Sequence, residues 1–253
     1  MIGHFKENMT VLGEITILSK DFLKCMFTRP FYWGRLYEQI LQLGVGSLSI
    51  TIVIGVVTGL VMTLQFGYGL AKFGGTLYVP AIVSLSLMRE LAPIFTSLLI
   101  AGRIGSGISA EIGAMNVTQQ IDAIRALGTN PIRVLVVPRV LATVISLPLL
   151  TTLSAFMGIL GGLSIAYSEF SMPAGFYINK VLSSVGLTDV FGSMFKCAFF
   201  GFIIAIVACY RGFQTKEGTK GVGQATTWVV VTTSIVILIS DFFLSKLLIL
   251  LFD

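Results

Sequence analysis

The chain has 253 residues, of which 55% are hydrophobic and only 11% are charged, and its mean hydropathy is +0.92. Soluble domains carry roughly a quarter charged residues, so this composition excludes a water-soluble fold. The formal net charge of +5 is better explained by loops that face the cytoplasm than by a surface that binds nucleic acid, and we expect no nucleic-acid partner.

Residues 1–42 are predicted to form amphipathic helices that lie in the plane of the membrane interface. Apolar residues recur there at helical spacing while the charged residues fall on another face. The apolar positions are Val11, Ile15, Leu18, Phe22 and Met26. Pro30 is expected to end the first helix, because proline cannot continue the hydrogen-bonding pattern. The alternative is an ordinary surface helix packed on the rest of the protein.

Residues 43–253 are predicted to form a single all-α membrane domain with about five spans. A helix needs roughly 20 mostly apolar residues to cross the hydrocarbon layer. Five runs meet this requirement, at about 43–66, 78–102, 140–166, 187–210 and 225–251. The first and third runs contain no charge, whereas the other three contain charged residues that need an explanation. The pairs Gly55 with Gly59 and Gly158 with Gly162 favour close helix approach, more often within a subunit than between subunits.

The Lys and Arg residues of the connecting segments predict the orientation of these spans. If the N-terminus is cytoplasmic, the cytoplasmic segments hold twelve of these residues and the outer loops hold only Lys72 and Lys180. Short cytoplasmic loops are enriched in Lys and Arg. We therefore expect a cytoplasmic N-terminus and a C-terminus on the outer side.

The connection between the second and third spans, residues 103–139, contains the signals of a short helix. Asn116 is predicted as its N-cap, with Gln119 three residues later, and Gly128 and Pro131 are predicted to stop it. Such a helix is too short to span the membrane. On the residues alone, two interpretations stay open: a re-entrant or surface-lying piece that only closes the bundle, or a handle that is gripped by a soluble partner.

Several motifs closely resemble the MlaE (YrbE) family of permease subunits. These are RELAP at 89–93, AGRIGSGISAEIGAM at 101–115, VTQQIDAIRALGTNP at 117–131, VVPRVLA at 136–142 and GVGQATTWVVV at 221–231. The family belongs to ABC-type lipid transporters that work with MCE proteins. The resemblance implies a homodimeric permease that moves phospholipid, with ATP bound by cytoplasmic ATPase subunits. It further implies a periplasmic MCE-domain protein and a small STAS-domain protein as partners.

The same resemblance identifies the short helix as the coupling helix that docks on the ATPase. The candidate docking residues are Val117, Gln119, Gln120, Ile121, Asp122, Ile124, Arg125 and Leu127. Gln119 stands where the family usually has Glu, which removes one charge from the expected contact. We expect the bacterial inner membrane rather than a plastid, because no transit segment precedes the first helix.

Besides Lys246, which lies near the outer end of the fifth span and can extend to the interface, four charged residues lie deep inside predicted spans: Arg89 and Glu90 in the second, Lys196 in the fourth and Asp241 in the fifth. Each costs at least roughly 2.5–3.5 kcal/mol in the hydrocarbon, so each should have a partner or a task. Counting about 1.5 Å of rise per residue places all four in the outer half of the bundle. They are interpreted either as ion pairs that lock three helices together or as part of a lipid path that meets a polar headgroup.

The sequence offers no catalytic residue and no metal site. Residues 69–76 have the glycine spacing of a phosphate-binding loop, but Gly75 occupies the position of the required lysine. His4 has no companion to form a site. The three cysteines lack metal-binding spacing and are predicted to be apolar packing residues: Cys25, Cys197 and Cys209. We therefore expect no cofactor on this chain and ATP on a partner subunit.

Two other functions are compatible with these patterns. In an ion-coupled secondary transporter or channel, Glu90 and Asp241 would carry protons or cations, and this chain alone would transport in response to an ion gradient. In a membrane scaffold without a translocation path, the charges would only pair with one another. Crosslinking of lipid to residues that flank Lys196 would count against the scaffold.

Overall fold

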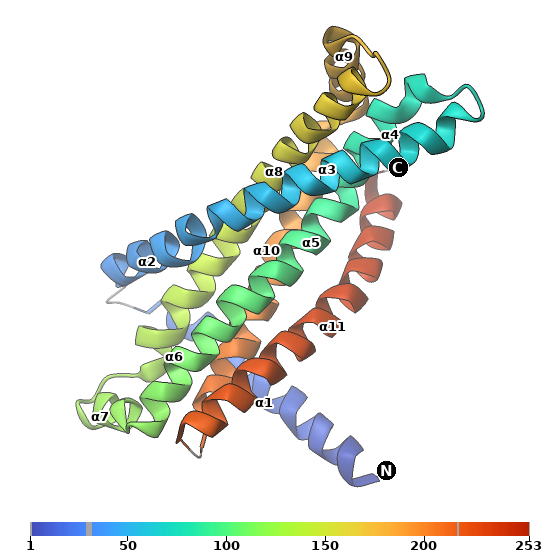
Figure 1. Ribbon diagram of the computed structural model, residues 1–253. Helices are drawn as coiled ribbons and strands as arrows, with labels where there is room; N and C mark the ends of the chain where they lie inside the picture. Colours follow the sequence, from blue (N-terminus) through green and yellow to red (C-terminus); the bar gives the residue numbers. More distant parts are fainter. Residues whose placement is uncertain (1, 29–31, 217, 253) are drawn as a thin grey trace.

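The computed structural model describes residues 2–28, 32–216 and 218–252, and this part of the chain forms helices joined by short turns, without strands (Figure 1). Five helical units are long and apolar enough to cross a membrane: Trp33–Ala71, Thr76–Val117, Ile132–Ser168, Leu187–Phe213 and Gly218–Leu251. The all-α membrane fold with five spans and an N-terminal helix is therefore confirmed. The helical units extend beyond most of the predicted apolar runs, because their polar and aromatic flanks continue the helical hydrogen bonding.

The helices follow one another in the order shown in Figure 1. They are α1 (Ile2–Met26), α2 (Trp33–Gln39), α3 (Leu48–Ala71), α4 (Val79–Ser86), α5 (Ala92–Ile100), α6 (Ser106–Val117), α7 (Gln120–Ala126), α8 (Val137–Ser168), α9 (Ala174–Ser184), α10 (Leu187–Phe213) and α11 (Gly218–Phe252). Short π-helical turns interrupt the first two spans at η1 (Ile40–Gly44), η4 (Leu87–Leu91) and η5 (Ala101–Gly105), and another, η6 (Ile132–Val136), begins the third span. The 3₁₀ turns are η2 (Val45–Ser47) and η3 (Thr76–Tyr78). The first span starts at Trp33, inside the segment assigned to the N-terminal helices.

The spans run side by side, so the bundle has two ends that carry different elements (Figure 1). The end with α7, the start of α2, the end of α10 and the start of α11 is called the α7 end below. The opposite end carries α9, the turn between α3 and α4, and the C-terminus, and is called the α9 end.

Helix α8 lies at the centre of the bundle. In its most apolar window, 78% of the residues are buried, against 22% for the first span and 11% for α11. The packing of α3 on α8 depends on glycine, because a Cβ added to Gly59 would lie 1.8 Å from the Gly158 carbonyl oxygen. A Cβ added to Gly55 would lie 2.3 Å from the Ser154 oxygen. The small-residue pairs therefore act in packing within this subunit, as predicted.

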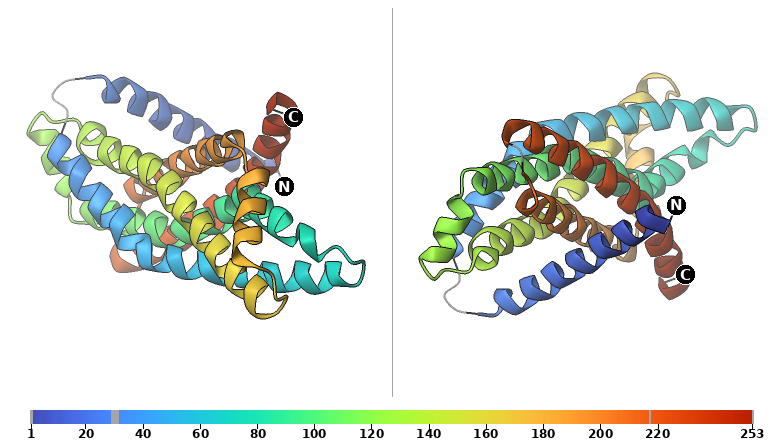
Figure 2. Two further views of the ribbon diagram at one scale, coloured as in Figure 1. Left: turned by 90° about the horizontal axis from the view of Figure 1, so that it is seen from above. Right: turned by 90° about the horizontal axis from the view of Figure 1, so that it is seen from below.

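Helix α1 lies across the bundle near the α7 end, beside α10 (Figures 1 and 2). Its predicted apolar face contacts the protein, where Phe22 is buried and Ile15 and Leu18 pack on the core. The Glu14 carboxylate accepts hydrogen bonds from the Tyr210 hydroxyl (2.8 Å) and the Gln214 amide (2.6 Å). A second apolar face is exposed, with Met9, Leu12, Ile17 and Leu23, and the exposed Phe27 follows directly after the helix. Its location in the membrane interface stays a prediction, and Pro30 lies outside the described residues.

Candidate functional site

A π-helical turn in the second span positions two of the four charged residues that were predicted to lie inside the membrane. This turn, η4, contains Arg89 and Glu90, and Pro93 follows it in the first turn of α5. Proline has no N–H to donate to the carbonyl four residues earlier, which is the carbonyl of Arg89. The Lys196 ammonium donates to that carbonyl oxygen instead, at 2.9 Å. The bulge and the proline thus expose a backbone acceptor inside the membrane domain, a feature often found at functional sites.

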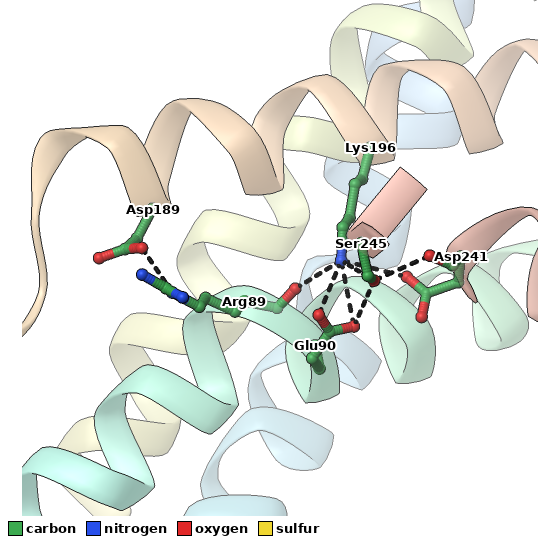
Figure 3. Close-up of polar contacts among 6 residues, drawn as sticks. All are labelled: Arg89, Glu90, Asp189, Lys196, Asp241 and Ser245. Carbon is green, nitrogen blue, oxygen red and sulfur yellow. Dashed lines mark hydrogen bonds and ion pairs between the residues drawn. The ribbon is translucent and has the colours of Figure 1, made fainter. Parts of the chain in front are cut away.

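Lys196 joins three spans through one ammonium group (Figure 3). Its Nζ lies 3.0 and 3.1 Å from the two carboxylate oxygens of Glu90 and 3.4 Å from Oδ1 of Asp241. It also donates a hydrogen bond of 2.7 Å to the Ser245 hydroxyl, which lies 3.1 Å from Glu90 Oε2. The second, fourth and fifth spans therefore meet where the sequence placed three of the four charges.

The side chain of Arg89 points away from this cluster toward the start of α10 (Figure 3). Its Nε forms an ion pair of 2.6 Å with Oδ1 of Asp189. Asp189 also accepts the Gly186 N–H at 2.8 Å and so caps the beginning of α10. Sequence reasoning missed Asp189, although it precedes Lys196 by seven residues and shares its helix face. That spacing was the signal that could have found it.

A small pocket lies between these charged groups. Its volume is about 60 Å³, and its walls are formed by Arg89, Glu90, Thr188, Asp189, Gly192, Ser193, Lys196, Ser245, Leu248 and Ile249. Drug-sized ligands occupy roughly 300–1,000 Å³, so the pocket fits a few water molecules or a small polar group. The side chains of Arg89 and Glu90 are 41% and 39% exposed, whereas Lys196 is 2% exposed. The side chain of Lys196 is therefore buried, whereas those of Arg89 and Glu90 are partly exposed at the mouth of the pocket.

The short helix between the second and third spans is present, but its start differs from the prediction. Helix α6 continues through Val117, the chain turns at Gln119 with a φ of 58°, and α7 begins at Gln120. Asn116 is therefore not the N-cap of α7. Its amide instead donates hydrogen bonds of 3.0 Å to the carbonyls of Phe213 and Thr215, at the end of α10.

The other features of α7 follow the sequence pattern. Gly128 ends it with a φ of 73°, and the Gly128 N–H donates to the Arg125 carbonyl at 2.9 Å. Ile121 is fully buried and seats the helix on the bundle. Asp122 and Arg125 form an exposed ion pair of 3.0 Å. Most of the predicted docking residues are exposed, namely Val117, Gln119, Gln120, Asp122, Arg125 and Leu127, while Ile124 is partly buried. The end of the bundle thus presents a mixed polar and apolar surface.

Comparison with known proteins accounts for this combination of spans and motifs. A family model described as "Permease MlaE" matches residues 36–247. The chain belongs to the MlaE permease family. Two relatives are named probable ABC transporter permease proteins. The one from Synechocystis is 46% identical over 211 residues, which cover 83% of this chain and 80% of that protein. The one from Rickettsia typhi is 36% identical over 237 residues, covering 94% and 92%.

A relative from Arabidopsis thaliana is named protein TRIGALACTOSYLDIACYLGLYCEROL 1, chloroplastic. It is 32% identical over 233 residues, which cover 92% of this chain and 67% of that protein. The resemblance identified from the motifs is confirmed. As an MlaE family member, this chain is a multi-pass transmembrane permease of the ABC transporter type, and this type of protein works in a membrane-associated complex with ATPase partners.

Proposed function

We propose that this MlaE family chain is the permease subunit of an ATP-driven phospholipid transporter. It would pass lipid between the bacterial inner membrane and a periplasmic MCE-type carrier. The observation that carries the proposal is the pocket between the second, fourth and fifth spans, where groups of both charges lie inside an apolar bundle. A polar headgroup can contact the open side at Arg89 and Glu90 while its acyl chains stay among apolar side chains. The name of the Arabidopsis relative, which refers to a galactolipid, also supports a lipid cargo.

The remaining parts of the machine are proposed to lie on other chains. ATP would be hydrolysed by a separate ATPase that docks on α7, where Gln120, Asp122 and Arg125 are exposed. Gln119 would offer a neutral amide in place of the usual family Glu. Two copies of this chain would pair, and a periplasmic MCE-domain protein and a small STAS-domain protein would complete the complex.

The distribution of basic residues supports a cytoplasmic α7 end. The twelve Lys and Arg residues of the segments expected inside are Lys6, Lys20, Lys24, Arg29, Arg35, Arg103, Arg125, Arg133, Arg139, Arg211, Lys216 and Lys220. The N-terminus would then be cytoplasmic and the C-terminus periplasmic. Lys196 is nine residues after Leu187, the first residue of α10, so the pocket would lie about 14 Å from the periplasmic end of that helix.

Affinity purification from native membrane tests this proposal. The tagged chain should bring down an ATPase, an MCE-domain protein and bound phospholipid, identified by mass spectrometry. A chain that purifies alone, and that moves ions in vesicles in response to an ion gradient, would support the secondary transporter instead. In that case Glu90 and Asp241 would be its ion-carrying residues.

A further inference from the structure

The end of α10 is closed by a residue from another span. The last carbonyl groups of a helix have no partner within it and need one from elsewhere. Phe213 is the last residue of α10, and Thr215 follows two positions later. The Asn116 amide, in the last turn of α6, donates to both of their carbonyl oxygens at 3.0 Å. One side chain of the second span therefore completes the end of the fourth.

The backbones of α6 and α10 also pack closely at this junction. A Cβ added to Gly212 would lie 2.8 Å from the Ile112 Cβ and 3.3 Å from the Ser109 carbonyl oxygen. A Cβ added to Gly113 would lie 3.0 Å from Oγ1 of Thr215. Close-packed interiors transmit displacement rather than absorb it. The ends of the two helices should therefore move together as long as the Asn116 hydrogen bonds hold their alignment.

Helix α7 is attached directly to this junction. Only Thr118 and Gln119 separate it from α6, and its buried Ile121 seats it on the bundle. A displacement of α7 therefore reaches the last turn of α6 through a two-residue connection, and Asn116 lies in that turn.

Helix α10 offers the stiffer route from this junction to the charged pocket. The second span is interrupted by the π-helical turns η4 and η5 between α6 and α4, and such turns are sites where helices kink. Helix α10 runs without interruption from Leu187 to Phe213 and carries Lys196. The 17 residues from Lys196 to Phe213 correspond to about 26 Å of straight helix. A shift at Phe213 is thus carried along α10 to the Lys196 ammonium.

We propose that Asn116 is a positioning residue that couples the movement of α7 to α10 and so to the contact between Lys196 and Glu90. The inference rests on the proposed function, in which an ATPase acts on α7. Asn116 would act through the Phe213 and Thr215 carbonyls and is not one of the residues that line the pocket. Its hydrogen bonds determine whether a displacement of α7 moves α10, and with it Lys196, or moves α6 alone.

The test uses the complete complex reconstituted in vesicles, with ATP hydrolysis and lipid transfer measured on the same sample. In Asn116→Ala, we expect ATP hydrolysis to continue while the lipid transferred per ATP falls about tenfold, within the range of ordinary coupling energies. Asn116→Gln keeps two N–H donors on a longer side chain and should recover part of this ratio. The matched control is Asn130→Ala, because the Asn130 side chain accepts the Ile132 N–H on the other side of α7 and bonds neither carbonyl of α10.

Three results would overturn the inference. If Asn116→Ala transfers as much lipid per ATP as Asn130→Ala, Asn116 does not couple the helices, and the proposed function survives. If neither Asn116 variant assembles while the control does, Asn116 is a folding residue instead. If the wild-type complex hydrolyses ATP but transfers no lipid, the proposed function fails, and the inference fails with it.

Discussion

Replacing Lys196 by methionine separates the two roles proposed for the buried charges. The ammonium has contacts within 3.4 Å to Glu90, Asp241, Ser245 and the Arg89 carbonyl. Breaking a buried ion pair by removing one partner costs about 3–5 kcal/mol. The Glu90 side chain is only partly buried, with 39% of it exposed, so we expect the lower end, about 3 kcal/mol. For a chain of this size that corresponds to a fall in Tm of about 6–12 °C.

The double variant Lys196→Met with Asp241→Asn removes both the cation and one buried anion. It should regain much of the lost Tm, because replacing a buried pair by neutral groups costs far less than breaking it. Lipid transfer should be abolished in the double variant and also in the single variants Lys196→Ala and Asp241→Ala. All three complexes should still assemble. Tm would be measured on purified complex in detergent, with Lys246→Met as the control, since Lys246 is exposed on the same helix as Asp241.

Three outcomes would contradict this reasoning. An unchanged Tm in Lys196→Met would show that the contacts carry no stability. A double variant that regains both Tm and lipid transfer would show that the charges only lock the helices. Failure of both alanine variants to accumulate in the membrane would support the same locking role.

Two further predictions concern packing. Gly59→Ala should lower Tm by several degrees, because its Cβ would overlap the Gly158 carbonyl and overpacking costs about 1–3 kcal/mol. The control is Gly69→Ala on the same helix, where nothing lies within 4 Å of the added Cβ, so Tm should stay unchanged. Equal effects of the two variants would argue against close contact between α3 and α8. In folded protein, a maleimide probe should label the partly exposed Cys25 before the buried Cys197, as followed by intact mass; the reverse order would contradict the placement of α10.

The number and order of the spans were predictable because the bilayer imposes a simple rule. Each crossing requires a long apolar run, and the runs in this sequence are separated by charged loops. The meeting of Glu90, Lys196 and Asp241 was predictable for a related reason: a charge in hydrocarbon needs a partner, and residue counting placed these three at a similar depth.

The details that failed depend on contacts between distant segments. Arg89 was grouped with the cluster, but the π-helical turn and Pro93 direct its backbone to Lys196 and its side chain to Asp189. Asparagine is a residue type that favours N-cap positions, yet the Asn116 amide donates a hydrogen bond to the Phe213 carbonyl, at the end of α10 and 97 residues away in the sequence. Local sequence shows that an asparagine can satisfy helix ends, but only the tertiary arrangement decides which helix.

The most direct test of the central claim is lipid transfer from vesicles that contain this chain with and without its ATPase partners. Labelled phospholipid in the vesicle membrane would be followed as it moves to an MCE-domain acceptor. We predict transfer only when the ATPase and ATP are both present, and none from this chain alone under an ion gradient. Transport by this chain alone, driven by such a gradient, would contradict the account.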